Sequence, residues 1–61
     1  MYEVLIDRVD IDENIEREVI EVETKRKAIG LAVEEMKWES GYYAAVIHQG
    51  RVVFTKKGEF I

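Results

Sequence analysis

The sequence contains no cysteine, and no apolar run in its 61 residues approaches the ~18 residues of a membrane-spanning helix. The lack of cysteine excludes a disulfide framework and a thiolate metal site, and it fits a reducing cytoplasm. Residues 1–3 do not begin like a signal peptide. We therefore expect a single cytoplasmic domain over residues 1–61, without membrane association.

Side chains that commonly carry out catalysis are also scarce. Ser40 is the single serine, and we expect it to serve the end of a helix. His48 is the single histidine and has no catalytic partner close in the sequence. Asp10, Asp12 and Asn14 are spaced like the first ligands of a calcium loop, but Ile15 occupies the sixth position, where such a loop needs glycine. The sequence predicts a protein that is not an enzyme and uses no metal and no cofactor.

The net charge of −4 is unevenly divided along the chain. Residues 1–24 carry nine acids and two bases, a sum of −7, whereas residues 25–61 carry seven bases and four acids, a sum of +3. One half could face a basic protein surface while the other faces an anion, or the two could neutralise each other across neighbouring strands. A domain this small buries only ~60% of its unfolded surface, so we expect tight packing or self-association to reinforce it.

A helix is predicted from Thr24 to Gly41. Thr24 can cap its start by accepting a hydrogen bond from a free backbone N–H of the first turn, and Gly41 would supply a left-handed stop. At about 100° per residue, one side of this segment is apolar and must lie on the core. The residues of this stripe are Ala28, Ile29, Ala32, Val33 and Met36.

Four extended segments accompany the helix, at residues 2–9, 15–24, 42–48 and 51–57. Their composition is typical of strands, and Gln49-Gly50 suits a two-residue hairpin turn. The glutamates of the second segment indicate a protected sheet edge. The predicted fold is α+β, with the order β-β-α-β-β and a four-stranded sheet that the helix covers on one face. The right-handed crossover rule favours a β-grasp-like order, with the first and last strands parallel in the middle.

The last two strands are apolar on both faces, although one helix can cover only one. Any face in water should be polar, so something must cover the second: the tail Phe60-Ile61, a second subunit or a partner protein. We expect a homodimer. The predicted turn pairs Ile47 with Val52, Ala45 with Phe54, and Val46 with Val53. The expected helix-facing set is Tyr43, Ala45, Ile47, Val52 and Phe54, and the opposite set is Tyr42, Ala44, Val46 and Val53.

The predicted helix begins with three bases, although the macrodipole already makes this end positive. One interpretation is an anion site for a phosphate or for a carboxylate of a partner. The alternative is that these bases pair with Glu21 and Glu23 across the neighbouring strand. The candidate anion-binding residues are Thr24, Lys25, Arg26 and Lys27.

Two other surfaces are candidates for protein binding. Leu31 and Trp38 are seven residues apart and align opposite the core stripe, so they could form an apolar docking ridge. Alternatively, Trp38 folds back over the margin of the sheet. The second candidate is an acidic strand that would face a basic partner surface, with the residues Glu16, Glu18, Glu21 and Glu23.

The passage VETKRKAIGLAVEEMKWESGYYAAVI resembles the strand–helix–strand part of many small bacteriophage proteins. Their features are an acidic strand ending in Glu-Thr or Glu-Ser, a helix with the pattern A-I-x-x-A, and a Gly-aromatic start to the next strand. The chain is most similar to the family of small phage inhibitors of bacterial host RNA polymerase, over about residues 16–48. It differs by adding a fourth strand and by lacking a clear counterpart of that family's strongly negative strip and of its arginine pair. The resemblance implies a small phage interaction protein.

Together these features favour a non-enzymatic protein, phage-encoded, that binds a host protein and inhibits or redirects it. The alternative is a nucleic-acid or phosphate-ligand binding module, which the overall acidity opposes. A designed or purely structural module without a partner is a third class. The alternative module would use Lys25, Arg26, Lys27, Arg51, Lys56 and Lys57 together with Tyr42 and Tyr43.

Overall fold

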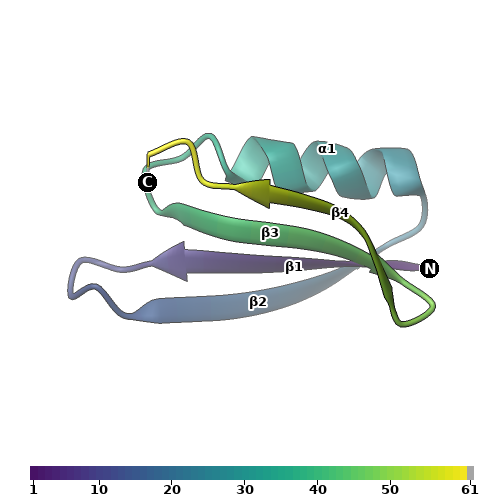
Figure 1. Cartoon of the computed structure of the whole chain (residues 1–61), viewed down its shortest axis with the longest axis horizontal. Helices are drawn as coiled ribbons and strands as arrows, with labels where there is room; N and C mark the ends of the chain where they lie inside the picture. Colours follow the sequence, from purple (N-terminus) through teal and green to yellow (C-terminus); the bar gives the residue numbers. More distant parts are fainter. Residues whose placement is uncertain (61) are drawn as a thin grey trace.

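The computed structural model describes residues 1–60, which form a four-stranded antiparallel sheet with one helix across one face (Figure 1). This arrangement confirms the predicted α+β class and the order β-β-α-β-β. The elements are β1 (Tyr2–Val9), β2 (Ile15–Val22), α1 (Lys25–Glu35), β3 (Gly41–His48) and β4 (Arg51–Lys57).

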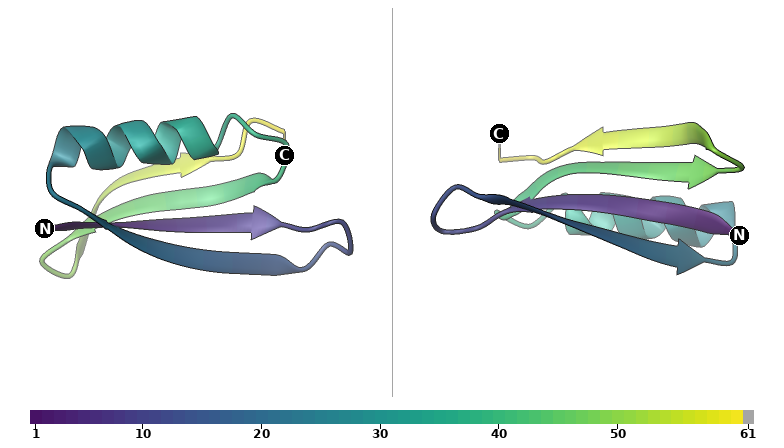
Figure 2. Two further views of the ribbon diagram at one scale, coloured as in Figure 1. Left: turned by 180° about the vertical axis from the view of Figure 1, so that it is seen from behind. Right: turned by 90° about the horizontal axis from the view of Figure 1, so that it is seen from below.

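The strand order across the sheet is β2-β1-β3-β4 (Figure 2), so the β-grasp-like order is wrong. β2 and β3 both run antiparallel to β1, which makes β2–α1–β3 a parallel crossover over one strand. The connections at 23–24 and 36–40 are short, and an 11-residue helix is only about 16 Å long. Because these connections are short, β3 lies directly beside β1 and not one strand further out, as the β-grasp-like order requires. β4 then folds back onto the outer edge of β3.

The helix is shorter than its sequence predicts. Thr24 caps it as expected, since its Oγ1 accepts a hydrogen bond of 3.2 Å from the Lys27 N–H. The helix ends at Glu35, with Met36 as its C-cap, and Gly41 does not adopt the left-handed conformation. Gly41 instead begins β3, where a Cβ would lie 2.7 Å from the Glu35 carbonyl oxygen. The glycine is therefore needed for the close approach of β3 to the helix end, not for a helix stop.

The core lies between α1 and the sheet. The expected helix stripe is confirmed for Ala28, Ala32 and Met36, which are fully buried, and for Ile29, which packs against them. Val33 is only half-buried. On β3, however, the predicted faces are reversed: Ala44 and Val46 face the helix. A small side chain at Ala44 lets the alanines of α1 approach the sheet closely. The fully buried core residues are Val4, Ile6, Ala28, Ala32, Met36, Ala44 and Val46.

A β-bulge at Val53 explains the remaining error in register. Ile47 lies opposite Val52 as predicted, across a turn in which Gln49 and Gly50 have φ of 52° and 75°. Val53 has no partner residue on β3, so Val46 pairs with Phe54 and Ala45 with Thr55. The extra residue turns Phe54 onto the helix side, where it packs against the core.

The tail follows the helix side of the molecule. The Gly58 N–H donates to the Tyr42 carbonyl at 2.9 Å, and the Glu59 N–H donates to the Met36 carbonyl at 3.1 Å. Phe60 is exposed beyond them, and Figure 1 shows this segment rising toward the end of α1. Phe60 therefore does not cover the opposite sheet face, which was one of the three alternatives, and Ile61 lies outside the described residues.

Candidate interaction surfaces

The face of the sheet away from α1, here called the outer face, lies open. The right-hand view of Figure 2 looks onto the strands of this face, with α1 behind them. Strand alternation places on it the residues that neighbour the buried positions. Within residues 1–60 no helix or loop lies across it. Its apolar members are Leu5, Val9, Ile15, Val19, Tyr43, Ala45, Ile47 and Val52.

Several of these apolar side chains are open to solvent. Ile15 is 54% exposed, Val19 53% and Val52 59%. An antiparallel sheet normally carries polar residues on the face that meets water. The sequence therefore correctly indicated a second apolar surface on the sheet, although it assigned the wrong residues of β3 to it.

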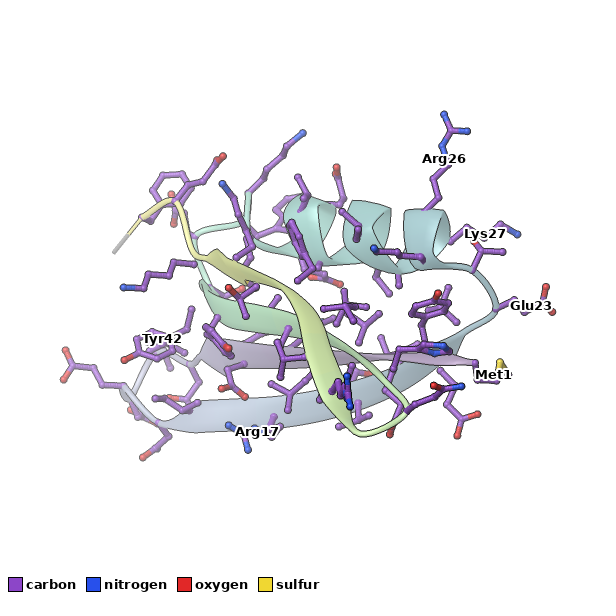
Figure 3. All side chains as sticks on the ribbon, turned by 45° about the vertical axis from the view of Figure 1, so that its right-hand side comes forward. Met1, Arg17, Glu23, Arg26, Lys27 and Tyr42 are labelled. Atoms are coloured by element: carbon purple, nitrogen blue, oxygen red, sulfur yellow. The ribbon has the colours of Figure 1, made fainter. Side chains whose placement is uncertain are left out.

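A buried carboxylate interrupts this face. Asp7 is only 5% exposed, and Arg17 binds both of its oxygens, with Nε at 2.8 Å and a terminal nitrogen at 3.1 Å. These hydrogen bonds hold the pKa of Asp7 below its usual range, against the opposing effect of burial. Figure 3 shows Arg17 on the side of the sheet away from the helix.

Asp7 also lines a shallow hollow with Tyr42, Tyr43 and Lys57, with a volume of about 290 Å³. Tyr42 reaches it because it sits in a second β-bulge, between the residues of β3 that pair with Asp7 and Arg8. The hollow thus joins the outer face to one end of the molecule. Its walls offer two aromatic rings, one ammonium group and a carboxylate already bound by Arg17.

On the opposite face, Arg8 links three elements. It donates to Glu18 of β2 at 2.8 Å and to Glu35 of α1 at 3.0 Å. The hydrogen bond to Glu18 is the main cause of a raised Arg8 pKa, and Glu35 adds to it against the effect of burial. Glu35 lies at the helix end where an acid is unfavourable, and Arg8 offsets that cost.

The predicted acidic strand does not form one surface. β2 is an edge strand, as expected, but Glu16 and Glu18 share the helix side of the sheet while Glu21 lies on the outer face. Glu18 is bound by Arg8, and Glu23 lies beyond the strand. The acidic β2 and the basic β4 are opposite edges of the sheet, so they do not neutralise each other as neighbouring strands.

The basic residues at the helix start are exposed. Figure 3 shows Arg26 directed away from the sheet and Lys27 beside the start of α1. In the part of the chain that the structure describes, no ion pair joins Lys25, Arg26 or Lys27 to Glu21 or Glu23. The pairing alternative is therefore not formed, and an anion site at this end stays a prediction.

The predicted ridge of Leu31 and Trp38 does not form. Because the helix ends at Glu35, Trp38 lies in the turn that follows and has no helical register with Leu31. Leu31 packs against the core, whereas Trp38 is 61% exposed. Neither the ridge nor the alternative, in which Trp38 folds over the sheet margin, describes the structure.

Trp38 instead belongs to a group that sequence reasoning did not bring together. Backbone hydrogen bonds join the Gly41 N–H to the Trp38 carbonyl at 3.0 Å and, as above, attach the tail to Met36 and Tyr42. They place three exposed aromatic residues around one end of the molecule. The group, here called the aromatic end, consists of Trp38, Tyr42 and Phe60, which are 61%, 39% and 62% exposed.

The residues proposed for nucleic-acid binding are divided between the two ends of the molecule. Lys57 lines the hollow with Tyr42 and Tyr43. The bases of residues 25–27 lie at the start of α1, at the opposite end of the molecule (Figure 1). Arg51 follows the β3–β4 turn. They do not form one continuous basic patch.

His48 lies at the end of β3 beside the N-terminus. Its ring stacks on Tyr2 with centroids 4.1 Å apart, and its Nδ1 lies 2.9 Å from the Met1 carbonyl oxygen. Asp10 of the calcium-like segment accepts hydrogen bonds from the N–H groups of Asp12 and Asn14, so it holds its own turn. No cluster of three potential metal ligands occurs among the residues described.

Comparison with protein-family models, curated proteins and solved structures gives no match for this chain. The helical part of residues 1–60 is neither long nor apolar enough to cross a membrane.

Proposed function

We propose that this chain is a small non-enzymatic interaction protein, phage-encoded and cytoplasmic, that assembles as a homodimer and binds a host protein to inhibit or redirect it. The partner docks on the aromatic end. The observation that carries this proposal is the exposure of Trp38 and Phe60 on a segment that backbone hydrogen bonds hold in place.

Physical reasons support docking at this end. Trp and Tyr are enriched among the residues that dominate binding energy. A segment fixed by backbone hydrogen bonds loses little conformational entropy when it binds. Lys57 lines the hollow with Tyr42, and the exposed acids Glu39 and Glu59 are the sequence neighbours of Trp38 and Phe60. A partner with an apolar pocket and a polar rim of both charges therefore fits this surface.

Affinity capture from bacterial lysate tests the proposal with matched variants. Trp38→Ala should weaken binding of the captured protein by roughly 30-fold, the effect of losing a hot-spot residue worth about 2 kcal/mol. Ile11→Ala is the control, because Ile11 is 97% exposed in the β1–β2 turn and also loses an apolar side chain there.

A partner held equally by wild type, Trp38→Ala and Ile11→Ala would contradict docking at the aromatic end. Salt-sensitive capture of DNA or RNA in place of a protein would favour the nucleic-acid module instead. The observation that supports this second function is the hollow, which Tyr42, Tyr43 and Lys57 line.

A further inference from the structure

We propose that two copies of the chain pack outer face to outer face, about a two-fold axis that crosses the strands along the row Val19–Leu5–Ala45–Thr55. This inference rests on the homodimer in the proposed function and adds its geometry. It leaves Trp38 and Phe60 free, so partner binding and dimer formation can be measured separately.

The strand register defines the cross-strand rows of the outer face, of which three span all four strands and a shorter one is the pair Val9 and Ile15. Among the three long rows, a central uncharged row, called the apolar row although it ends in Thr55, lies between a row whose two charges are acidic and a row that carries both bases of this face. The acidic row is Glu21, Glu3, Ile47 and Val52; the apolar row is Val19, Leu5, Ala45 and Thr55; the basic row is Arg17, Asp7, Tyr43 and Lys57.

The basic row keeps a positive charge despite Asp7. Asp7 is buried and ionised, and its two hydrogen bonds from Arg17 largely neutralise that guanidinium. The two bases and one acid of this row sum to +1, and Lys57 contributes most of the charge that a partner meets. The acidic row presents Glu3 and Glu21, both of them exposed. One face therefore carries opposite charges on the two sides of its apolar centre.

This distribution of charge selects a second copy and one of two symmetric stackings. An axis across the strands lays the acidic row of each copy on the net-positive basic row of the other. Glu21 then meets Arg17 and Val52 meets Lys57, while Glu3 lies over Asp7, a like charge that Arg17 already binds. An axis along the strands lays each row on itself and brings Arg17 against Lys57. Complementary charges fix orientation, and like charges facing each other oppose binding. The first stacking is favoured.

Pairing through the free edge of β4 is less favourable. Two β4 strands paired antiparallel about Phe54 would place Arg51 of each copy opposite Lys57 of the other, because these residues are equally distant from Phe54 in the strand. Like charges directly opposite each other destabilise a strand pair. By contrast, the molecule seen onto this face measures about 33 by 15 Å, which allows the ~1,000 Å² of total burial that a specific interface requires.

Sedimentation equilibrium with two glutamate variants tests the interface and its orientation. The wild type should show a concentration-dependent mass approaching twice the 7.1 kDa of the chain. Val19→Glu places two like charges across the axis and should weaken the dimer at least about tenfold. Val52→Glu changes an equally exposed residue of the same face, but its new charge meets Lys57, so the dimer should persist.

A wild-type mass of 7.1 kDa at all concentrations would overturn the inference. So would persistence of the dimer in both variants, equal loss in both, or loss only in Val52→Glu, which the axis along the strands predicts. Circular dichroism tests whether the Val19→Glu variant is folded. If the variant is unfolded, cross-linking replaces sedimentation of this variant as the test.

Cross-linking gives this second measurement. Because the chain has no cysteine, Val19→Cys carries one thiol, and a short bis-maleimide should join two copies through it. Ile11→Cys is the control and should stay monomeric. Cross-linking of Val19→Cys only when it is mixed with Thr55→Cys would indicate the other axis and overturn the proposed one.

The two proposals fail in different ways. A monomeric wild type that still captures its partner through Trp38 overturns the dimer and leaves partner binding intact. A dimeric wild type whose partner capture does not depend on Trp38 overturns docking at the aromatic end and leaves the dimer intact. Val19→Glu, measured in the capture experiment, connects the two results because it changes only the outer face.

Discussion

At the scale of single residues, Asp7 shows how a carboxylate can be buried on a sheet face that no other element covers. A carboxylate removed from water is costly unless hydrogen bonds satisfy it. Arg17 supplies two such bonds from the neighbouring strand, and its guanidinium lies over the carboxylate while 61% of its own side chain meets water. The pair thus combines a buried acid with an exposed base.

The pKa of Asp7 makes this pair sensitive to pH. Because the folded-state pKa of Asp7 is lowered from its usual value of 3.8, the stabilisation is present above that value and is lost as the pH falls through the folded pKa. We expect Arg17→Met to lower the free energy of unfolding at pH 7 and to differ less from wild type in acid, where Asp7 is protonated. Urea unfolding at several pH values measures both effects.

Arg51→Met is the matched control for this experiment, since it removes the same charge from an exposed hairpin position. It should leave the pH dependence of stability unchanged. If Arg17→Met and Arg51→Met have the same small effect at pH 7, the Asp7–Arg17 pair does not stabilise the fold. The protein concentration must be low enough to keep dissociation out of the measured free energy.

At the scale of elements, two glycines have opposite roles. Gly30 lies on the exposed side of α1, where a Cβ would meet nothing within 4 Å. Gly58, at the end of β4, is buried, and a Cβ there would lie within van der Waals radius of the Gly41 carbonyl group. The first glycine only weakens its helix, while the second allows two backbone segments to touch.

Alanine at each of these positions should therefore change stability in opposite directions. Gly30→Ala should stabilise the protein by about 0.5–1 kcal/mol through helix propensity. Gly58→Ala should destabilise it by about 1–3 kcal/mol, because backbone must move to make room. Thermal unfolding of the two variants measures the difference, and a neutral Gly58→Ala would show that the tail is not held as the structure indicates.

The first turn of α1 gives a prediction about the helix itself. Replacing Lys25, Arg26 and Lys27 together by Gln should leave the free energy of unfolding unchanged or slightly higher, because exposed bases oppose the helix dipole by only a few tenths of a kcal/mol each. Chemical denaturation is the measurement. Unfolding of the triple variant would mean that these side chains have structural partners and would remove the reason to propose an anion site.

At the scale of the whole molecule, the sequence predicted the features that depend on local patterns. The spacing of Ala28, Ala32 and Met36 identifies the buried side of α1, and Thr24 identifies its start, because both depend on residues within a few turns. The glutamates of β2 identified this strand as a sheet edge in the same way, from residues within a single strand. The element order followed from these patterns and from the Gln49-Gly50 turn.

The features that sequence reasoning missed depend on contacts between elements. Residues 43–47 are apolar at every position, so alternation could not decide which side faces α1. The bulge at Val53 and the attachment of the tail to Met36 arise from tertiary packing. The aromatic end was missed for the same reason, because distant segments form it and its local signal in the sequence was limited to the aromatic residues close to Gly41.

The single tryptophan lies outside the core, in the turn after α1, and this position determines what its fluorescence can report. Trp38 is largely in water in the folded protein, so its emission changes little when the core unfolds, and unfolding is better followed by circular dichroism. A protein that covers the aromatic end removes the indole from water and shifts the emission to shorter wavelength. The chain therefore carries its own optical sensor for partner binding, at a site where no label needs to be attached.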